Sequence, residues 1–246
     1  MSRRKRRFEE LIRANVLPVA RFRRQEGGNY QPGRYVGSGF TFGEGTFAMC
    51  WHCVSEPLGD DEVYGAAWRA GGVYSTKYTH ALLFGDLARD VQGGDVALAR
   101  IDIEDPMRLV LATEPFPWGA GVIACGYPLT TDTRDPTTGD PHVATEARVL
   151  RGYVTRILMD DLSGQEPMRA FELDMRAPAG MSGSPLLNPD TLEVGGLVYG
   201  TRTSYQPGEE EPFTFSLAMH LDVLRKASGP ATDGLPLCDF LAREQS

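Results

Sequence analysis

The sequence has few cysteines and histidines, and it lacks any long apolar run. Four cysteines among 246 residues do not make the disulfide framework of a small secreted domain. No stretch of about 18 apolar residues is present that would cross a bilayer as a helix. Residues 8–13 carry charges that interrupt the apolar core a secretory signal needs. We therefore expect a cytoplasmic protein with reduced thiols and no membrane association.

The chain also lacks the overall positive charge that is typical of a nucleic-acid-binding domain. Its formal net charge is −8, yet residues 1–25 carry nine basic side chains against two acidic ones. A basic arm is thus attached to an acidic body, which would repel phosphates. Apolar residues three and four positions apart predict an amphipathic helix over residues 3–16. We expect it to pack on the body with a solvated basic face, while nucleic acid, a membrane surface or a partner remain alternative contacts for the arm 3–24.

The composition favours a mostly β protein. The chain is 41% hydrophobic and has 28 glycines and 17 prolines, so short apolar runs alternate with turn residues. Such spacing is typical of antiparallel barrels or sandwiches. We expect a closing helix over residues 217–227. Strands are expected at residues 35–42, 45–50, 63–69, 74–79, 96–103, 108–111, 120–126, 143–157, 169–175, 184–187, 193–200 and 212–218.

The most informative stretch is residues 179–185, which read Ala-Gly-Met-Ser-Gly-Ser-Pro. Ser182 lies between glycines, which permit a sharp turn with positive φ and leave room for a substrate carbonyl. The same turn can aim the backbone N–H groups of Gly180 and Ser182 at one point, where they would stabilise an oxyanion. Clusters of glycine, serine and proline are also ordinary turns, so the chemistry needs a base and an acid elsewhere in the chain.

A serine hydroxyl needs a base to become nucleophilic, and four histidines are present to supply it. His52 ends an apolar strand, where rigid support favours a catalytic group. His80 and His142 look like ordinary surface or turn residues. His220 lies among apolar neighbours on the expected closing helix, as a core or groove histidine does. The sequence therefore favours His52 as the base.

Asp95 is the candidate that orients this base. It opens directly into an apolar strand, which would carry its carboxylate into a partly buried position. An unpaired buried carboxylate is costly, and an imidazole N–H is its natural partner. Asp86, Asp90 and Asp102 lack this setting and are expected to be solvated.

These three blocks resemble the signature blocks of the trypsin-like, chymotrypsin-fold serine proteases of bacterial intracellular type. His52 lies in MCWHCV, Asp95 in GDVALARI and Ser182 in GMSGSP, separated by 43 and 87 residues in the order His, Asp, Ser. The resemblance covers roughly residues 30–228. Supporting blocks are GSGFTF at 37–42, GVIACGYP at 121–128, VGGLVYG at 194–200 and FTFSLAMHLDVLRK at 213–226.

The resemblance implies an all-β fold of two six-stranded antiparallel barrels with an N-terminal basic helix and a C-terminal helix. It implies a basic arm at 1–28, a first barrel at 29–115 with His52 and Asp95, and a second barrel at 116–246 with Ser182. Ser182 would attack the scissile carbonyl while His52 accepts its proton and Asp95 holds the imidazole. The amides of Gly180 and Ser182 would bind the oxyanion, and no cofactor or metal is implied.

Three positions depart from the family pattern. Met181 stands where digestive members carry an aspartate that pairs with a freshly cut N-terminus, so that activation device is not expected. Cys53 has no cysteine in the preceding strand to pair with and is expected to be a free, buried thiol. Arg176 falls at the floor of the specificity pocket, where a cation would favour an acidic substrate side chain. The pocket would also include the β segment Val198, Tyr199 and Gly200.

A zinc site around Cys50 and Cys53 is a weaker alternative. A closed zinc site needs a second pair of ligands, and Cys125 and Cys238 are isolated in the sequence. Alternation along residues 46–54 would also turn neighbouring side chains to opposite faces. We therefore predict no metal.

The expected function is that of a serine endopeptidase that cleaves a specific protein or peptide. A target in a bacterial defence pathway is one example. An activating protein partner is compatible with the absent activation device. The first alternative is a catalytically silent or partner-activated interaction module of the same fold. The second is a nucleic-acid-binding protein that uses the basic arm.

Overall fold

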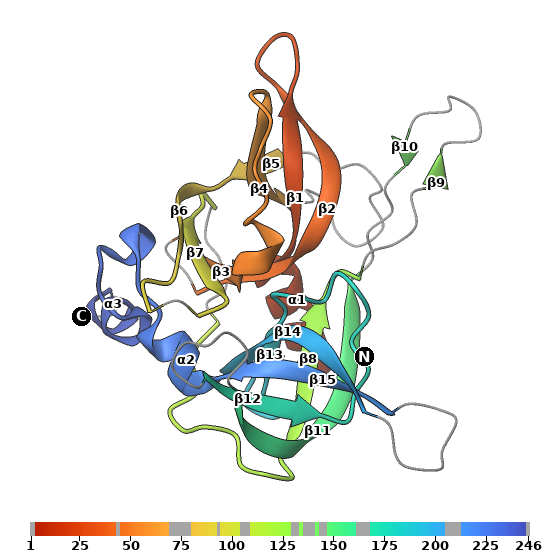
Figure 1. Ribbon diagram of the computed structural model, residues 1–246, viewed down its shortest axis with the longest axis vertical. Helices are drawn as coiled ribbons and strands as arrows, with labels where there is room; N and C mark the ends of the chain where they lie inside the picture. Colours follow the sequence, from red (N-terminus) through yellow and green to blue (C-terminus); the bar gives the residue numbers. More distant parts are fainter. Residues whose placement is uncertain are drawn as a thin grey trace.

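The structure, a computed structural model, describes residues 3–42, 45–68, 80–92, 94–103, 109–128, 133–134, 141–142, 147–160, 168–204 and 213–244. Two antiparallel β units stack on one another, and short helices lie to one side of them (Figure 1). The chain is therefore an all-β protein with two barrels, as expected. No helix among these residues is long and apolar enough to span a membrane. The predicted strand at 74–79 falls outside the described residues.

The first unit is a seven-stranded antiparallel sheet in the order β5-β4-β1-β2-β3-β7-β6, which curls into a nearly closed barrel (Figure 1). Among the described residues this is one strand more than the six expected. Residues 16–24, 80–83 and 85–89 join the sheet although no strand was expected there, whereas the described part of the strand expected at 108–111 makes only an isolated bridge at Leu111. The strands are β1 (Val16–Arg24), β2 (Tyr30–Thr41), β3 (Thr46–Cys50), β4 (Glu62–Trp68), β5 (His80–Leu83), β6 (Gly85–Arg89) and β7 (Val96–Arg100). The short 3₁₀ turn η1 (Trp51–Cys53) follows β3 directly.

The second unit is a closed barrel of six strands in the order β11-β12-β15-β14-β13-β8. Its strands are β8 (Gly121–Gly126), β11 (Arg148–Asp160), β12 (Met168–Leu173), β13 (Pro185–Leu187), β14 (Val194–Ser204) and β15 (Phe213–His220). A small hairpin of β9 (Thr133–Arg134) and β10 (Pro141–His142) lies between β8 and β11 in the chain. The chain ends with α2 (Leu221–Lys226), η2 (Pro230–Thr232) and α3 (Leu237–Arg243).

One apolar cluster joins the two units. It contains Met49 and Val96 from the first unit and Leu197 and Met219 from the second, all fully buried. The interior of the second barrel forms a separate cluster around Phe171 and other buried side chains. Because the larger cluster includes side chains of both units, their burial holds the barrels together.

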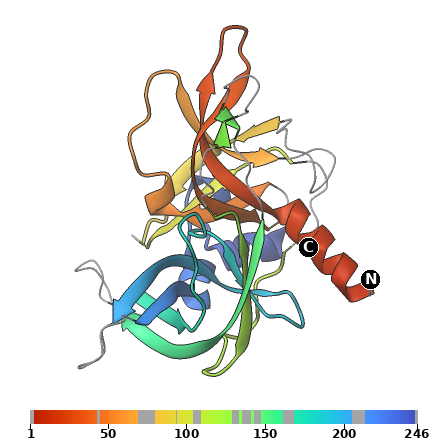
Figure 2. The ribbon, with the colours of Figure 1, turned by 90° about the vertical axis from the view of Figure 1, so that its right-hand side faces the viewer.

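The N-terminal helix α1 (Arg3–Asn15) continues into β1 without an intervening residue. Asn15 is fully buried, and its side-chain amide donates a hydrogen bond of 2.8 Å to the Leu11 carbonyl. Its Oδ1 accepts a hydrogen bond of 2.9 Å from the Thr41 hydroxyl on β2. Leu11 and Ile12 are buried against the first barrel, while the start of the helix extends outward (Figure 2). The predicted helix is confirmed.

Two boundaries differ from those expected. The arm was placed at 1–28, but β1 already pairs with β2 and β4 in the sheet. Residues 16–20 are buried throughout, so the alternation that marks a half-buried strand is missing there. The closing helix was placed at 217–227, but β15 runs to His220 and the helix begins at Leu221. The Leu217 backbone is used in strand pairing with β12 and β14 instead.

Two polar residues also lie in settings that differ from those expected. Asp90 was expected to be solvated but is buried, and its carboxylate accepts a hydrogen bond of 3.1 Å from the Ser228 amide. His220 caps α2 by accepting the Asp222 amide rather than lying within the helix. Its ring lies against Phe171, and burial lowers the pKa of His220 below its ordinary value. A neutral capping histidine fits a structural role.

Candidate active site

His52 is carried by the 3₁₀ turn at the end of β3. The turn is closed by the Val54 amide, which donates a hydrogen bond of 2.9 Å to the Trp51 carbonyl. β3 is fully buried, and the chain leaves the sheet at this turn. The His52 side chain is 47% exposed as a result. A buried strand thus supports a ring that solvent can reach, as the sequence predicted.

Asp95 lies beside His52 because β7 pairs with β3. The register places Cys50 opposite Val96, so the residue before Val96 faces the turn after Cys50. The Asp95 carbonyl accepts the Trp51 amide at 3.0 Å. One carboxylate oxygen accepts the His52 amide at 2.8 Å, and the other lies 2.6 Å from His52 Nδ1. Both oxygens therefore hold the same residue, one through its backbone and one through its ring.

These contacts strongly favour the protonated imidazole. The Asp95 hydrogen bond is the largest cause, a hydrogen bond with Cys53 adds to it, and together they raise the pKa of His52 to about 10. Desolvation acts in the opposite direction but is outweighed. The Asp95 contact therefore keeps a proton on Nδ1 and stabilises the imidazolium that forms when Nε2 accepts a second one.

The turn that carries Ser182 is pressed against the first barrel. Gly180 and Gly183 have φ of 91° and 89°, values that favour glycine. A Cβ on Gly183 would lie 1.9 Å from the Ser38 carbonyl oxygen. The Ser38 hydroxyl donates a hydrogen bond of 2.8 Å to the Gly180 carbonyl, and the Ser38 amide donates one of 2.8 Å to the Ser182 carbonyl. Ser38 on β2 thus clamps the turn at two points.

The amides expected to form an oxyanion site are available in this turn. Among the residues that the structure describes, no hydrogen-bond acceptor takes up the N–H of Gly180 or of Ser182. Their neighbours in the turn are occupied, since the Met181 amide binds the Pro178 carbonyl and the Gly183 amide binds the Val198 carbonyl. The two predicted donors are therefore available to a ligand.

The Ser182 hydroxyl is directed toward β14. Its Oγ donates a hydrogen bond of 3.4 Å to the Tyr199 carbonyl. Within the described part of the chain, no hydrogen bond joins this Oγ to a ring nitrogen of His52. The structure therefore brings His52 and Asp95 into direct contact, whereas Ser182 approaches from the second barrel without being bonded to the base.

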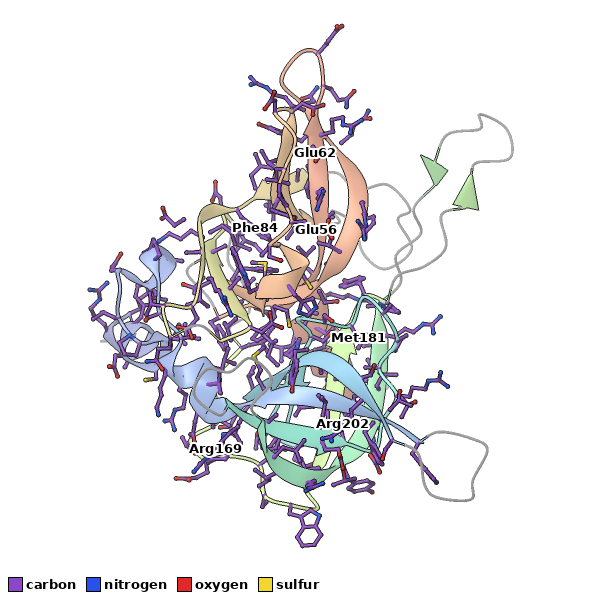
Figure 3. All side chains as sticks on the ribbon, viewed as in Figure 1. Glu56, Glu62, Phe84, Arg169, Met181 and Arg202 are labelled. Atoms are coloured by element: carbon purple, nitrogen blue, oxygen red, sulfur yellow. The ribbon has the colours of Figure 1, made fainter. Side chains whose placement is uncertain are left out.

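Met181 fixes the turn to the second barrel. Its side chain is fully buried in the core of the second barrel. Figure 3 labels Met181 on the side of this barrel that faces the first. The Ser184 hydroxyl lies 3.9 Å from its sulfur, and the Ser184 amide donates to the Met181 carbonyl. Apolar burial of Met181 therefore holds the turn in place.

The expected pocket residues lie on β14 and on the segment before the turn. Val198 is buried and pairs with Ala218, Gly200 pairs with Leu217, and a bulge lies at Tyr199 between them. Arg176 is exposed. The backbone on either side of it is fixed, because the Ser216 hydroxyl donates to the Met175 carbonyl at 2.8 Å and accepts the Ala177 amide at 2.7 Å.

Ser38 is a site residue that the sequence did not single out, and Cys50 was named only as a weak candidate zinc ligand. The Cys50 thiol is fully buried and donates a hydrogen bond of 3.3 Å to the Val198 carbonyl. Both residues link the first barrel to the second, and such contacts leave no local sequence signal. Cys53 is a free, buried thiol, as predicted. A Cβ on Gly37 would lie 2.6 Å from the Cys53 sulfur, so no side chain fits between them.

Comparison with known proteins agrees with this geometry. The sequence matches the family model described as "Trypsin-like peptidase domain" over residues 37–197. No curated protein matches the chain. Similar solved structures include the active form of the Rv3671c protease from M. tuberculosis, with a TM-score of 0.54 at 17% identity over 85% of this chain and 76% of that one. Its inactive form gives 0.55 at 15% identity over 97% and 94%. At these identities the likeness shows the fold.

We predict that Gly183→Ala strongly destabilises the protein. The new Cβ would meet the Ser38 carbonyl oxygen in a backbone conformation that L-residues rarely adopt. We expect a loss of at least about 3 kcal/mol in the free energy of unfolding, measured by urea denaturation. Gly200→Ala is the matched control, because it has open space and should change stability by less than about 1 kcal/mol. Equal stabilities for the two variants would contradict the close approach.

Proposed function

Because the chain belongs to the trypsin-like peptidase domain family, we propose that it is a serine endopeptidase that cleaves a specific protein or peptide through an acyl-enzyme intermediate. Ser182 is the nucleophile, His52 the general base and Asp95 the residue that orients the base. The observation that carries this proposal is the double contact of the Asp95 carboxylate with His52. It fixes the tautomer with a proton on Nδ1 and leaves Nε2 for the serine.

The reaction begins when Ser182 Oγ leaves the Tyr199 carbonyl and attacks the scissile carbonyl carbon. His52 Nε2 takes the hydroxyl proton, and Asp95 stabilises the resulting imidazolium. The amides of Gly180 and Ser182 stabilise the developing oxyanion, a type of contact that contributes about 3 kcal/mol per donor in related chemistry. His52 then gives its proton to the leaving amine. A water molecule, activated by the same ring, hydrolyses the acyl-enzyme.

The raised pKa of His52 and the orientation of the Ser182 hydroxyl favour a second candidate function. The pKa of His52 is raised to about 10, and Ser182 is bonded to Tyr199 rather than to His52. An enzyme in this state works poorly at neutral pH until a partner or substrate reorients the serine and the base. The alternative is therefore a partner-activated peptidase, or an interaction module of the same fold that does not cleave.

Other observations support a substrate preference and a cellular compartment. The exposed Arg176 favours an acidic side chain next to the scissile bond, because a guanidinium pairs well with a carboxylate. The basic residues of the arm 3–24 offer a further contact for an acidic partner. All four cysteines are free thiols, which supports a reducing, intracellular compartment.

A fluorophosphonate probe tests the nucleophile directly. We expect the probe to label the wild-type chain and not Ser182→Ala, because only an activated serine attacks the phosphorus. Labelling is read by mass spectrometry of the intact protein. Ser184→Ala, two residues away, should still be labelled. If the wild type is never labelled, alone or with lysate added, the non-cleaving module is the correct assignment.

The pH dependence of labelling tests the base. His52 must be neutral to act, so the second-order labelling rate should rise with pH and level off near pH 10, falling about tenfold for each unit below it. Cys53→Ala removes the second largest cause of the raised pKa and should move the profile to lower pH. A rate that is already flat above pH 7.5 in the wild type would contradict this state of the ring.

Cleavage of a peptide library tests the proposed preference. We expect cleavage next to Asp or Glu, and we expect Arg176→Gln to lower kcat/KM for those peptides by about tenfold while leaving the fluorophosphonate labelling rate unchanged. Arg148→Gln, an exposed arginine on β11, is the matched control. Preferred cleavage next to Lys, Arg or small residues would exclude an acidic preference.

A further inference from the structure

A group of potential metal ligands lies behind the proposed catalytic base. In the described part of the chain, Cys50 Sγ, His52 and Asp95 each offer one ligand atom, and these atoms all lie within 4.8 Å of one another. We propose that Cys50, His52 and Asp95 form an inhibitory binding site for Zn²⁺. The inhibitory effect rests on the proposed peptidase function, whereas the binding itself does not.

The donor set is one that zinc prefers. A thiolate, an imidazole nitrogen and a carboxylate oxygen are its usual protein ligands, at about 2.0 to 2.3 Å from the ion. A tetrahedral site of these donors has ligand atoms about 3.3 to 3.6 Å apart. The contact of 2.6 Å between Nδ1 and the Asp95 oxygen must open by less than about 1 Å. The widest pair, at most 4.8 Å, must close by a little more than about 1 Å.

The backbone holds these three residues in place without the ion. Cys50 is the last residue of β3 and pairs directly with Val96, and its thiol lies within 4.8 Å of the Asp95 carboxylate. The Asp95 carboxylate is held by the His52 amide at 2.8 Å. This site differs from the zinc site weighed from the sequence, because the third ligand is a carboxylate from β7 rather than Cys53.

Zinc can reach the site and displace what now occupies its ligands. The side chains of His52 and Asp95 are 47% and 24% exposed, so the ion enters from their side. The Cys50 thiol must leave the Val198 carbonyl. That carbonyl remains bonded to the Gly183 amide at 2.7 Å, so no buried acceptor is left without a partner. Magnesium and calcium are disfavoured, because they need several oxygen ligands and this group offers one carboxylate.

Binding at this site removes the base from the reaction. Zinc takes the Nδ1 lone pair and the Cys50 thiolate, and the protons that Nδ1 and the thiol held pass to solvent. The neutral ring then carries its remaining proton on Nε2. With a proton on Nε2 the ring has no lone pair for the Ser182 proton, so nucleophilic attack stops. A chelator that removes the zinc restores the free ring.

The binding test uses a variant that lacks the proposed nucleophile. We expect calorimetric titration of full-length Ser182→Ala with zinc chloride to give one saturable site. In that background, Cys50→Ala should weaken binding at least tenfold, as should Cys50→Ser, whose hydroxyl can still donate to Val198 but is a poor zinc ligand. Cys125→Ala, a buried free cysteine on β8, should bind zinc within twofold of the parent. Thermal melting verifies that each variant is folded.

Inhibition is tested on the active chain. Zinc chloride should slow fluorophosphonate labelling of the wild type at least tenfold, EDTA should restore it, and magnesium chloride should have no effect. Each Cys50 variant, compared with its own zinc-free rate, should be resistant. Zinc binding that survives Cys50→Ala overturns the site. Binding that leaves labelling unchanged overturns its inhibitory role. A wild type that is never labelled overturns the proposed function and leaves the titration to decide the site.

Discussion

The contact on which the site depends is the clamp between Ser38 and the nucleophile turn. The proposed base and its acid lie on the first barrel and the proposed nucleophile lies on the second, so the proposed reaction requires that the barrels keep one relative position. Ser38 fixes that position with its hydroxyl on the Gly180 carbonyl and its amide on the Ser182 carbonyl. The same hydroxyl accepts the Tyr127 amide at 2.8 Å. One small residue thus binds three groups, which come from two segments of the second barrel.

The glycines around this clamp follow from the same requirement. The backbone of the turn approaches β2 so closely that a Cβ at Gly183 would overlap the Ser38 carbonyl. At Gly126 a Cβ would lie 1.8 Å from the Ser184 hydroxyl. The close approach at these two positions is possible because glycine has no Cβ. Met181 holds the turn from the other side, because its side chain is buried in the core of the second barrel. The turn is held between the polar clamp of Ser38 and the buried side chain of Met181.

The parts of the site that depend on neighbouring residues in the chain could be predicted from the sequence. The apolar strand before His52 and the strand after Asp95 predicted the base and the acid, and the register of β3 with β7 explains why those two residues meet. The role of Ser38 could not be predicted, because its partner Gly180 lies 142 positions away and no local pattern marks the contact. The strand β1 was missed because it is buried on both faces where it follows the helix. The orientation of the Ser182 hydroxyl depends on a rotamer, which a sequence does not fix.

The junction between α1 and β1 gives the N-terminal helix a mechanical character. No residue separates Asn15 from Val16, and the Thr41 hydroxyl binds Asn15 from β2. β1 pairs with β2, the strand that also carries Ser38. A rotation of α1 must therefore either break the bond between Asn15 and Thr41 or move the strands beside the clamp.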